Sequence, residues 1–112
     1  HQPNVVLNFA LVGQGEFKPA SGRAVLDLDA KKAALVVSGL SSPGDGRDFT
    51  LWAIVGDEHV ACGRFESRPG DRIVRQFPIP VRDYADRVRG LIVTLESEET
   101  GEPTGPIVMK TL

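Results

Sequence analysis

The sequence predicts an all-β fold, either an antiparallel β-sandwich or a partly closed barrel, with about seven or eight short strands. Apolar and polar residues alternate over short segments, and turn signals separate these segments at spacings of about ten residues. The 12 glycines and 8 prolines are typical of short strands joined by tight turns. With 112 residues, the chain is long enough to bury a core as a single domain over residues 1–112.

Three strands are expected in the first part of the chain. Residues 5–12 form an apolar, β-prone segment that ends at the turn 13–15. Residues 23–29 alternate, with apolar side chains on one face and charged side chains on the other, as in a half-buried strand. The polar turn 30–32 and the apolar run 33–38 then predict a hairpin.

The segment 49–55 gives the strongest strand signal, because both of its faces are mostly apolar. Such a strand is expected to have neighbours on both sides and to be covered on both faces. The tight turn Gly56-Asp57 predicts a hairpin with residues 58–65. Trp52, in the middle of the segment, is expected to be a core anchor between two sheets; a sugar-stacking platform is the alternative.

The last third of the chain is less uniform. The segment 72–79 alternates, and Pro78 and Pro80 end its pairing or place it at a sheet edge. A short helical turn is expected near residues 81–88, because apolar residues recur there at helical spacing. The remaining expected elements are a strand at 91–96, a polar loop at 97–104 and a strand at 106–112.

Charge and residue content exclude several classes of function. The net charge of −2 and the pI of about 5.6 give no basic surface for nucleic acid or an anionic membrane. The chain has two histidines, His1 and His59, but no Gly-x-Ser-x-Gly motif that would supply a nucleophilic serine. No catalytic residue is therefore assigned, and an enzyme is not expected. One internal histidine and one cysteine cannot complete a zinc site, and the turn 44–48 lacks the carboxylates of a calcium loop. We therefore expect neither a metal nor a cofactor.

Several reactive-looking side chains are expected to be structural or solvated. Cys62 is expected to be a small buried residue, and a reactive thiol there would depend on His59 in the same hairpin. Asp27 and Asp29 are expected on a solvated strand face. A cluster of acidic residues is expected to lie in a solvated loop and not to perform acid–base catalysis, which needs opposed carboxylates in a cleft. The cluster consists of Glu96, Glu98, Glu99 and Glu102.

Short motifs occur in a fixed order through the second half of the chain. They are Phe49-Thr50-Leu51-Trp52, Ala61-Cys62-Gly63-Arg64-Phe65, Val93-Thr94-Leu95-Glu96 and Pro103-Thr104-Gly105-Pro106. In this order the chain resembles the C-terminal domain of the RskA-type anti-sigma-K factor family, over roughly residues 24–109. The resemblance implies structural roles for Leu51, Trp52, Gly63, Phe65, Thr94, Glu96, Pro103, Thr104, Gly105 and Pro106. Thr94, Glu96 and Thr104 are expected to form a hydrogen-bonded corner that holds the last loop.

The resemblance implies a regulatory function without catalysis. Proteins of this family are membrane-anchored bacterial regulators, whose cytoplasmic N-terminal domain binds a sigma factor. The chain would then be the extracytoplasmic sensory domain, excised from a longer membrane protein that controls an extracytoplasmic-function sigma factor through regulated proteolysis. A site-1 protease is a further implied partner. The alternative is a ligand-binding or adhesion module of a cell-surface protein.

The sequence contains no apolar run near the roughly 20 residues that a transmembrane helix requires. The sigma-binding domain is also expected to lie in a part of the protein that this sequence does not include. Contact with the membrane is therefore expected only through a transmembrane helix outside these residues.

Overall fold

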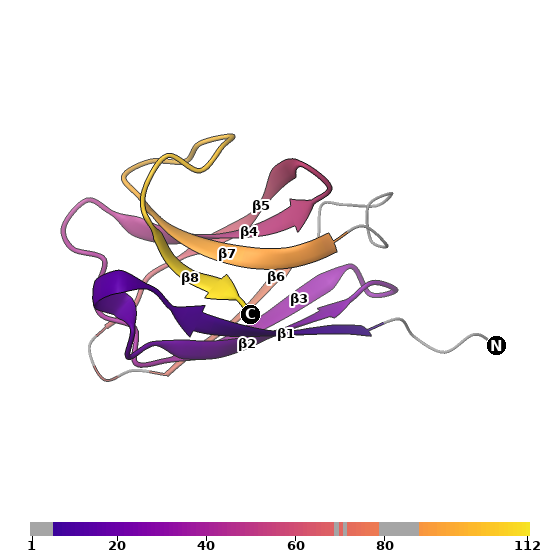
Figure 1. Cartoon of the computed structure of the whole chain (residues 1–112), viewed down its shortest axis with the longest axis horizontal. Coiled ribbons are helices and arrows are strands. Elements are labelled where there is room, and N and C mark those ends of the chain that lie inside the picture. The colour runs from indigo at the N-terminus through magenta and orange to yellow at the C-terminus, as the bar shows by residue number, and fades with distance from the viewer. Residues whose placement is uncertain (1–5, 69, 71, 79–87) are drawn as a thin grey trace.

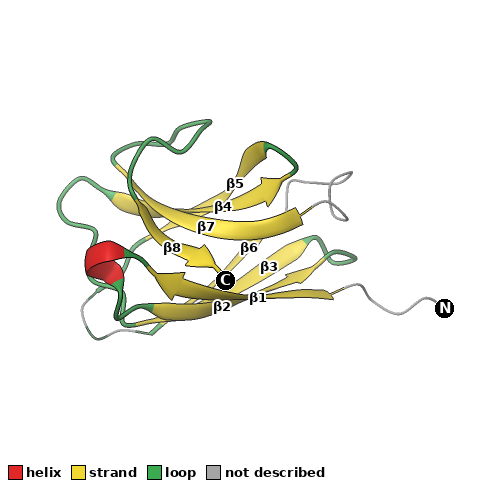
Figure 2. Cartoon of the chain, viewed as in Figure 1, coloured by secondary structure: helices red, strands yellow, loops and turns green. Residues whose placement is uncertain are grey.

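The computed structural model describes residues 6–68, 70, 72–78 and 88–112 of the chain. Among these residues the one helical element is a short 3-10 helix, η1 (Gly15–Phe17), drawn red in Figure 2. No helix in the described part of the chain has the length and hydrophobicity to cross a membrane. The strands are, in chain order, β1 (Val6–Gly13), β2 (Ser21–Asp27), β3 (Lys32–Ser38), β4 (Asp48–Val55), β5 (Glu58–Phe65), β6 (Ile73–Pro78), β7 (Val88–Glu96) and β8 (Ile107–Thr111).

The strands form one 8-stranded sheet that curls into a nearly closed barrel (Figure 1). Their order is β5-β4-β7-β8-β1-β2-β3-β6, and every neighbouring pair is antiparallel. The two edge strands, β5 and β6, come close to each other where the sheet curls round. The predicted all-β antiparallel fold is confirmed, and of the two architectures considered it is the barrel.

The predicted strands differ from the observed ones only at their ends, with two local corrections. The turn 13–15 leads into η1, which the sequence pattern did not indicate. Of the helical turn expected near residues 81–88, residues 81–87 lie outside the described residues, and Val88 already belongs to β7. The expectation is therefore wrong at Val88, whose place in β7 allows it to pair with Val55 of β4.

The barrel interior is filled by the alternating inward side chains of the strands. Four phenylalanines form a connected series through it, with centroids 6.1 Å apart for Phe17 and Phe49, 5.6 Å for Phe49 and Phe65, and 6.2 Å for Phe65 and Phe77. Such tilted and edge-to-face pairs are the favoured geometries for aromatic rings. The largest aliphatic members of this core include Leu11, Leu26, Leu35, Leu51, Leu91 and Met109.

The edges β5 and β6 approach each other through side chains. Gly63 on β5 faces Phe77 on β6, and a Cβ at Gly63 would lie 2.2 Å from the phenylalanine ring. A larger residue at position 63 would therefore displace the aromatic ring of Phe77, which packs across this side of the barrel. Pro78 ends β6, which pairs with β3 alone among the strands of the described residues, and its position agrees with the predicted sheet edge.

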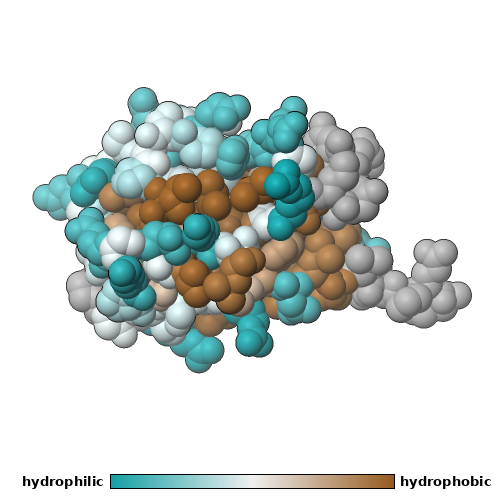
Figure 3. All heavy atoms as spheres, in the orientation of Figure 1, coloured by the Kyte–Doolittle hydropathy of each residue, from teal (hydrophilic) through white to brown (hydrophobic). Residues whose placement is uncertain are grey.

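β8 is short and pairs with each of its two neighbours over few residues. Among the described residues this strand pairs with β1 at residues 11–13 and with β7 at residues 92–94. Figure 3 shows apolar side chains gathered across the middle of the viewed face, around the region of β7, β8 and β1. Ile107 and Val6 are among the exposed large apolar side chains of the described residues.

Candidate functional site

A second buried layer lies outside the barrel, on the outer face of β4 and β7. Sheet register places Thr50 opposite Thr94, and Trp52 opposite Ile92. These four side chains and Glu96 are at most 6% exposed, although they point away from the barrel core. The loop of residues 97–106 between β7 and β8 lies over this face (Figure 1). We attribute the burial of the layer to this loop.

The centre of the layer is the carboxylate of Glu96, which accepts four hydrogen bonds. The hydroxyl of Thr104 donates to Oε1 at 2.6 Å. The Thr94 hydroxyl donates to Oε2 at 2.6 Å, and the backbone N–H groups of Thr104 and Gly105 donate to the same atom at 3.2 Å and 3.1 Å. The end of β7 is thereby attached to the start of the segment that leads into β8.

Trp52 extends this network to β4. Its indole N–H donates to the Thr94 hydroxyl at 2.7 Å, and that hydroxyl donates in turn to Glu96. Because a buried indole needs a hydrogen-bond partner, this arrangement explains why a tryptophan can face the outer layer. Trp52 is fully buried, as expected of an anchor, but it lies outside the apolar cluster of the barrel interior.

The surroundings of Glu96 favour its charged form. Burial by itself raises the pKa of the carboxyl, but hydrogen bonds from the Thr104 and Thr94 side chains and from the N–H groups of Gly105 and Thr104 outweigh this effect. The pKa of Glu96 is therefore held below its ordinary value of 4.5. At neutral pH the carboxylate is ionised, and its four hydrogen bonds are strengthened by the charge.

Backbone packing explains why the loop needs glycine beside this carboxylate. A Cβ at Gly105 would lie 1.7 Å from the carbonyl oxygen of Leu95 and 3.6 Å from Oε2 of Glu96. The next residue, Pro106, accepts a hydrogen bond from the Leu95 N–H at 3.1 Å through its carbonyl oxygen. The segment from Pro103 to Pro106 can therefore lie directly against the end of β7.

The acidic cluster divides into one buried and three exposed carboxylates. Glu98, Glu99 and Glu102 are exposed, as expected of a solvated loop. The expectation is wrong for Glu96, which is 2% exposed. Its hydrogen bonds from Thr94, Thr104 and Gly105 make Glu96 a structural support for the last loop.

The thiol and the histidine of β5 give no sign of nucleophilic chemistry. Cys62 is buried, as expected, and it is the extra residue of a β-bulge opposite Leu51 and Trp52. Desolvation by burial raises the pKa of Cys62 to about 11, against a smaller lowering by a backbone hydrogen bond from Ala53. The thiol is therefore protonated at neutral pH and weakly nucleophilic. His59 is half-buried on the same strand.

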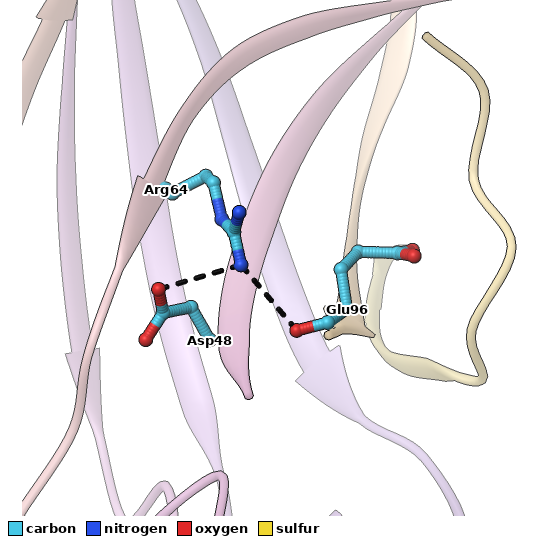
Figure 4. A network of polar contacts seen from close by, with 3 residues as sticks. All are labelled: Asp48, Arg64 and Glu96. Atoms are coloured by element: carbon cyan, nitrogen blue, oxygen red, sulfur yellow. Dashed lines mark hydrogen bonds and ion pairs between the residues drawn. The ribbon is translucent and has the colours of Figure 1, made fainter. Parts of the chain in front are cut away.

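The side chain of Arg64, on β5, contacts the end of β7 and also lines a cavity between the ends of β5 and β6. Its Nη2 lies 3.4 Å from Oδ2 of Asp48, and it donates to the backbone oxygen of Glu96 at 3.4 Å (Figure 4). The ion pair is partly exposed, with the two side chains 27% and 40% accessible, so it adds little to stability by itself.

Sequence reasoning did not single out the cavity beside Arg64. The cavity has a volume of about 550 Å³, and its lining includes Arg64, Arg68, Arg72 and Arg75. The signal was the recurrence of arginine over residues 64–75, although the two acids in that stretch partly obscure it. Within the described ranges, no group of three or more His, Cys, Asp or Glu side chains is placed to hold a metal ion.

The family model described as "Anti-sigma-K factor rskA, C-terminal" matches residues 5–107. The chain belongs to this family. No curated protein and no solved structure matches the chain significantly. For an RskA C-terminal domain, family membership implies a regulatory, non-catalytic role, and it implies that the full protein binds a sigma factor.

The motif residues of this RskA C-terminal domain fall into two groups in space. Leu51 and Phe65 are buried in the barrel, and Gly63 lies against Phe77 at its seam. The remaining motif residues build the hydrogen-bonded layer beneath the last loop or the segment that packs against it: Trp52, Thr94, Glu96, Pro103, Thr104, Gly105 and Pro106. The expected corner of Thr94, Glu96 and Thr104 is present as direct hydrogen bonds.

Proposed function

We propose that this domain is the extracytoplasmic sensory and regulatory part of a membrane-anchored anti-sigma factor. In this proposal the full protein controls an extracytoplasmic-function sigma factor, and regulated proteolysis, begun by a site-1 protease, releases that sigma factor. The observation that carries the proposal is the family match over residues 5–107. The structural use of Glu96 and the buried thiol of Cys62 support a role without catalysis.

The regulatory step would depend on whether the domain is folded. A barrel with paired strands and a tightly bound last loop presents few extended segments to a protease, because proteolysis acts on exposed or locally unfolded chain. The folded domain would thus protect the chain that links it to the membrane. A signal that loosens the barrel, or exposes that link, would allow the first cleavage.

The test uses the full-length protein in its own host, with a reporter under a promoter that requires the sigma factor. Gly105→Ala, which forces a Cβ against Leu95, should destabilise the domain and raise reporter expression without the inducing signal. Gly101→Ala in the same loop has no atom within 4 Å of the new Cβ, and it should leave expression at the uninduced level. Cleavage of the full-length protein is followed by immunoblot in the same cells.

The proposal fails if the Gly105→Ala domain is unfolded in those cells and the reporter stays silent. The coding sequence upstream of His1 gives a second, independent check. A small helical domain followed by an apolar stretch of roughly 20 residues would agree with the membrane-anchored regulator. Other surface modules in place of a sigma-binding domain would support the alternative, a ligand-binding or adhesion module.

A further inference from the structure

We propose that the cleft between the ends of β5 and β6 binds a phosphate group, carried by a soluble compound or by a lipid headgroup, through Arg64, Arg68, Arg72 and Arg75. This inference concerns binding alone, and it does not rest on the regulatory function proposed above. The cleft, of about 550 Å³, lies beside the loop that joins the two edge strands. Its size is within the range of small-molecule sites.

The charge of the cleft differs from that of the chain. Four of the 13 basic residues line it, together with the carboxylates of Asp48 and Glu66, whereas the whole chain has a net charge of −2. All four are arginines, whose planar guanidinium groups bind phosphate oxygens in pairs of parallel hydrogen bonds. A neighbouring cavity of about 590 Å³ shares Arg64, Arg68, Asp48 and Glu66 and adds Arg47 and Asp45, so it adds no net charge to that of the cleft.

Three of the four arginines are not bound to a carboxylate of the described residues, although Nη1 of Arg75 donates to the carbonyl oxygen of Val74 at 3.0 Å. Among the described residues the one ion pair is that of Arg64 with Asp48, so the guanidinium groups of Arg68, Arg72 and Arg75 have no carboxylate partner there. Nε of Arg64 is also buried without a hydrogen-bond partner in that part of the chain. A buried donor without a partner is costly, and the side chain that carries it is one of those that line the cleft.

Arg75 is placed by sheet register on the inward face of β6. It pairs with Leu35 of β3, and its neighbours on the same face, Ile73 and Phe77, are buried core residues. Arg75 itself is exposed, because it lies where the sheet edge opens into the cleft. An inward charge at a sheet edge can also serve to prevent edge-to-edge association, so the test must separate the two roles.

The experiment is a titration of the isotope-labelled chain with inorganic phosphate and pyrophosphate, against sodium chloride at equal ionic strength. Arginine Nε–Hε resonances are recorded by NMR, and the oligomeric state by light scattering. We expect saturable shifts of the Arg64 and Arg75 signals. Arg75→Gln and Arg68→Gln should each raise the apparent Kd at least tenfold. Arg23→Gln, which removes an exposed arginine on β2, should leave the Kd unchanged.

Vesicles distinguish the two sources of phosphate. Sedimentation with phosphatidylglycerol vesicles that is lost in Arg75→Gln would assign the site to a lipid headgroup. Binding of pyrophosphate without sedimentation would assign it to a soluble compound. The proposal is overturned if no phosphate probe gives a saturable shift, or if Arg23→Gln weakens binding as much as Arg75→Gln. It is also overturned if Arg75→Gln only causes association of the chain.

Discussion

At the residue scale, the position of the last loop depends on one carboxylate. Glu96 accepts bonds from its own strand and from the loop eight and nine residues further along the chain. Each bond to a buried, charged acceptor contributes about 1.5–3 kcal/mol. The backbone atoms that reach Glu96 can do so only if residue 105 has no side chain, because a Cβ there would overlap the Leu95 carbonyl.

Gly105→Ala should therefore destabilise the domain by about 1–3 kcal/mol or more, the usual range for forced overpacking. The loop would have to move away from β7, and the single tryptophan, which is linked to Glu96 through the Thr94 hydroxyl, would become partly hydrated. Urea denaturation measures the free energy of unfolding, and a red shift of native-state tryptophan emission reports the hydration of Trp52. Gly101→Ala is the matched control and should stay within about 0.5 kcal/mol of wild type. Equal stability of the two variants would contradict the packing described at Gly105.

At the element scale, β4 differs from an ordinary barrel strand because both of its faces are buried. Leu51 and Ala53 face the interior, whereas Thr50 and Trp52 belong to the buried outer layer. This double burial explains the continuous apolar character of the strand in the sequence. The outer layer is small, so we expect its stability to depend strongly on its largest side chain.

Trp52→Ala should cost about 3–5 kcal/mol, the usual range for removing a large buried aromatic side chain. Trp52→Phe keeps most of the ring but removes the donor to Thr94, and it should cost about 1–3 kcal/mol. Val74→Ala, at a site 59% exposed on β6, is the control and should change stability by less than about 0.5 kcal/mol. Thermal and urea unfolding followed by circular dichroism measure all three. An unchanged melting temperature in Trp52→Ala would mean that the outer layer does not support the fold.

The contact between Gly63 and Phe77 joins the two edge strands and can be tested as a pair. Gly63→Ala should cost about 1–3 kcal/mol, because the new Cβ would lie 2.2 Å from the ring. In a chain that also carries Phe77→Leu, the smaller side chain leaves room, so the added cost of Gly63→Ala should fall. Free energies of unfolding for the two single variants and the double variant give the coupling. Additive effects would contradict the contact across the seam.

The strands were predictable because each carries its own local pattern of alternation. The outer layer was only partly predictable, since the burial of Glu96 depends on the path of a loop that its acidic composition places in solvent. Likewise, no local pattern shows that Arg64 and Arg75, on different strands, line one cleft. Their approach follows from the closing of the sheet, which brings its first and last strands together. The family motifs supplied what local periodicity could not, because they marked the residues of the corner.

At the scale of the whole molecule, β8 is held by few strand pairs, so the corner before it matters for closing the barrel. This strand contacts β1 and β7 over short stretches only. The segment that precedes it is attached to β7 through Glu96 and through the hydrogen bond from Leu95 to Pro106. Loss of the Glu96 charge should therefore affect the cooperative unfolding of the whole barrel, and not the loop alone.

Acid should remove this contribution. Because the pKa of Glu96 is lower in the folded chain than its ordinary value of 4.5, its stabilising effect is fully present above that value and is lost as the pH falls through the folded pKa. The free energy of unfolding of the wild type should thus decline below about pH 4.5. Glu96→Gln, which has no charge to lose, should be less stable at pH 7 by about 1.5–3 kcal/mol and should show a shallower decline in acid. Urea denaturation of both proteins between pH 7 and pH 3 provides the comparison. Glu98→Gln, at an exposed position of the same loop, is the control and should have the same acid profile as the wild type. If the profiles of Glu96→Gln and the wild type are parallel, the stability of the barrel does not depend on the charge of Glu96.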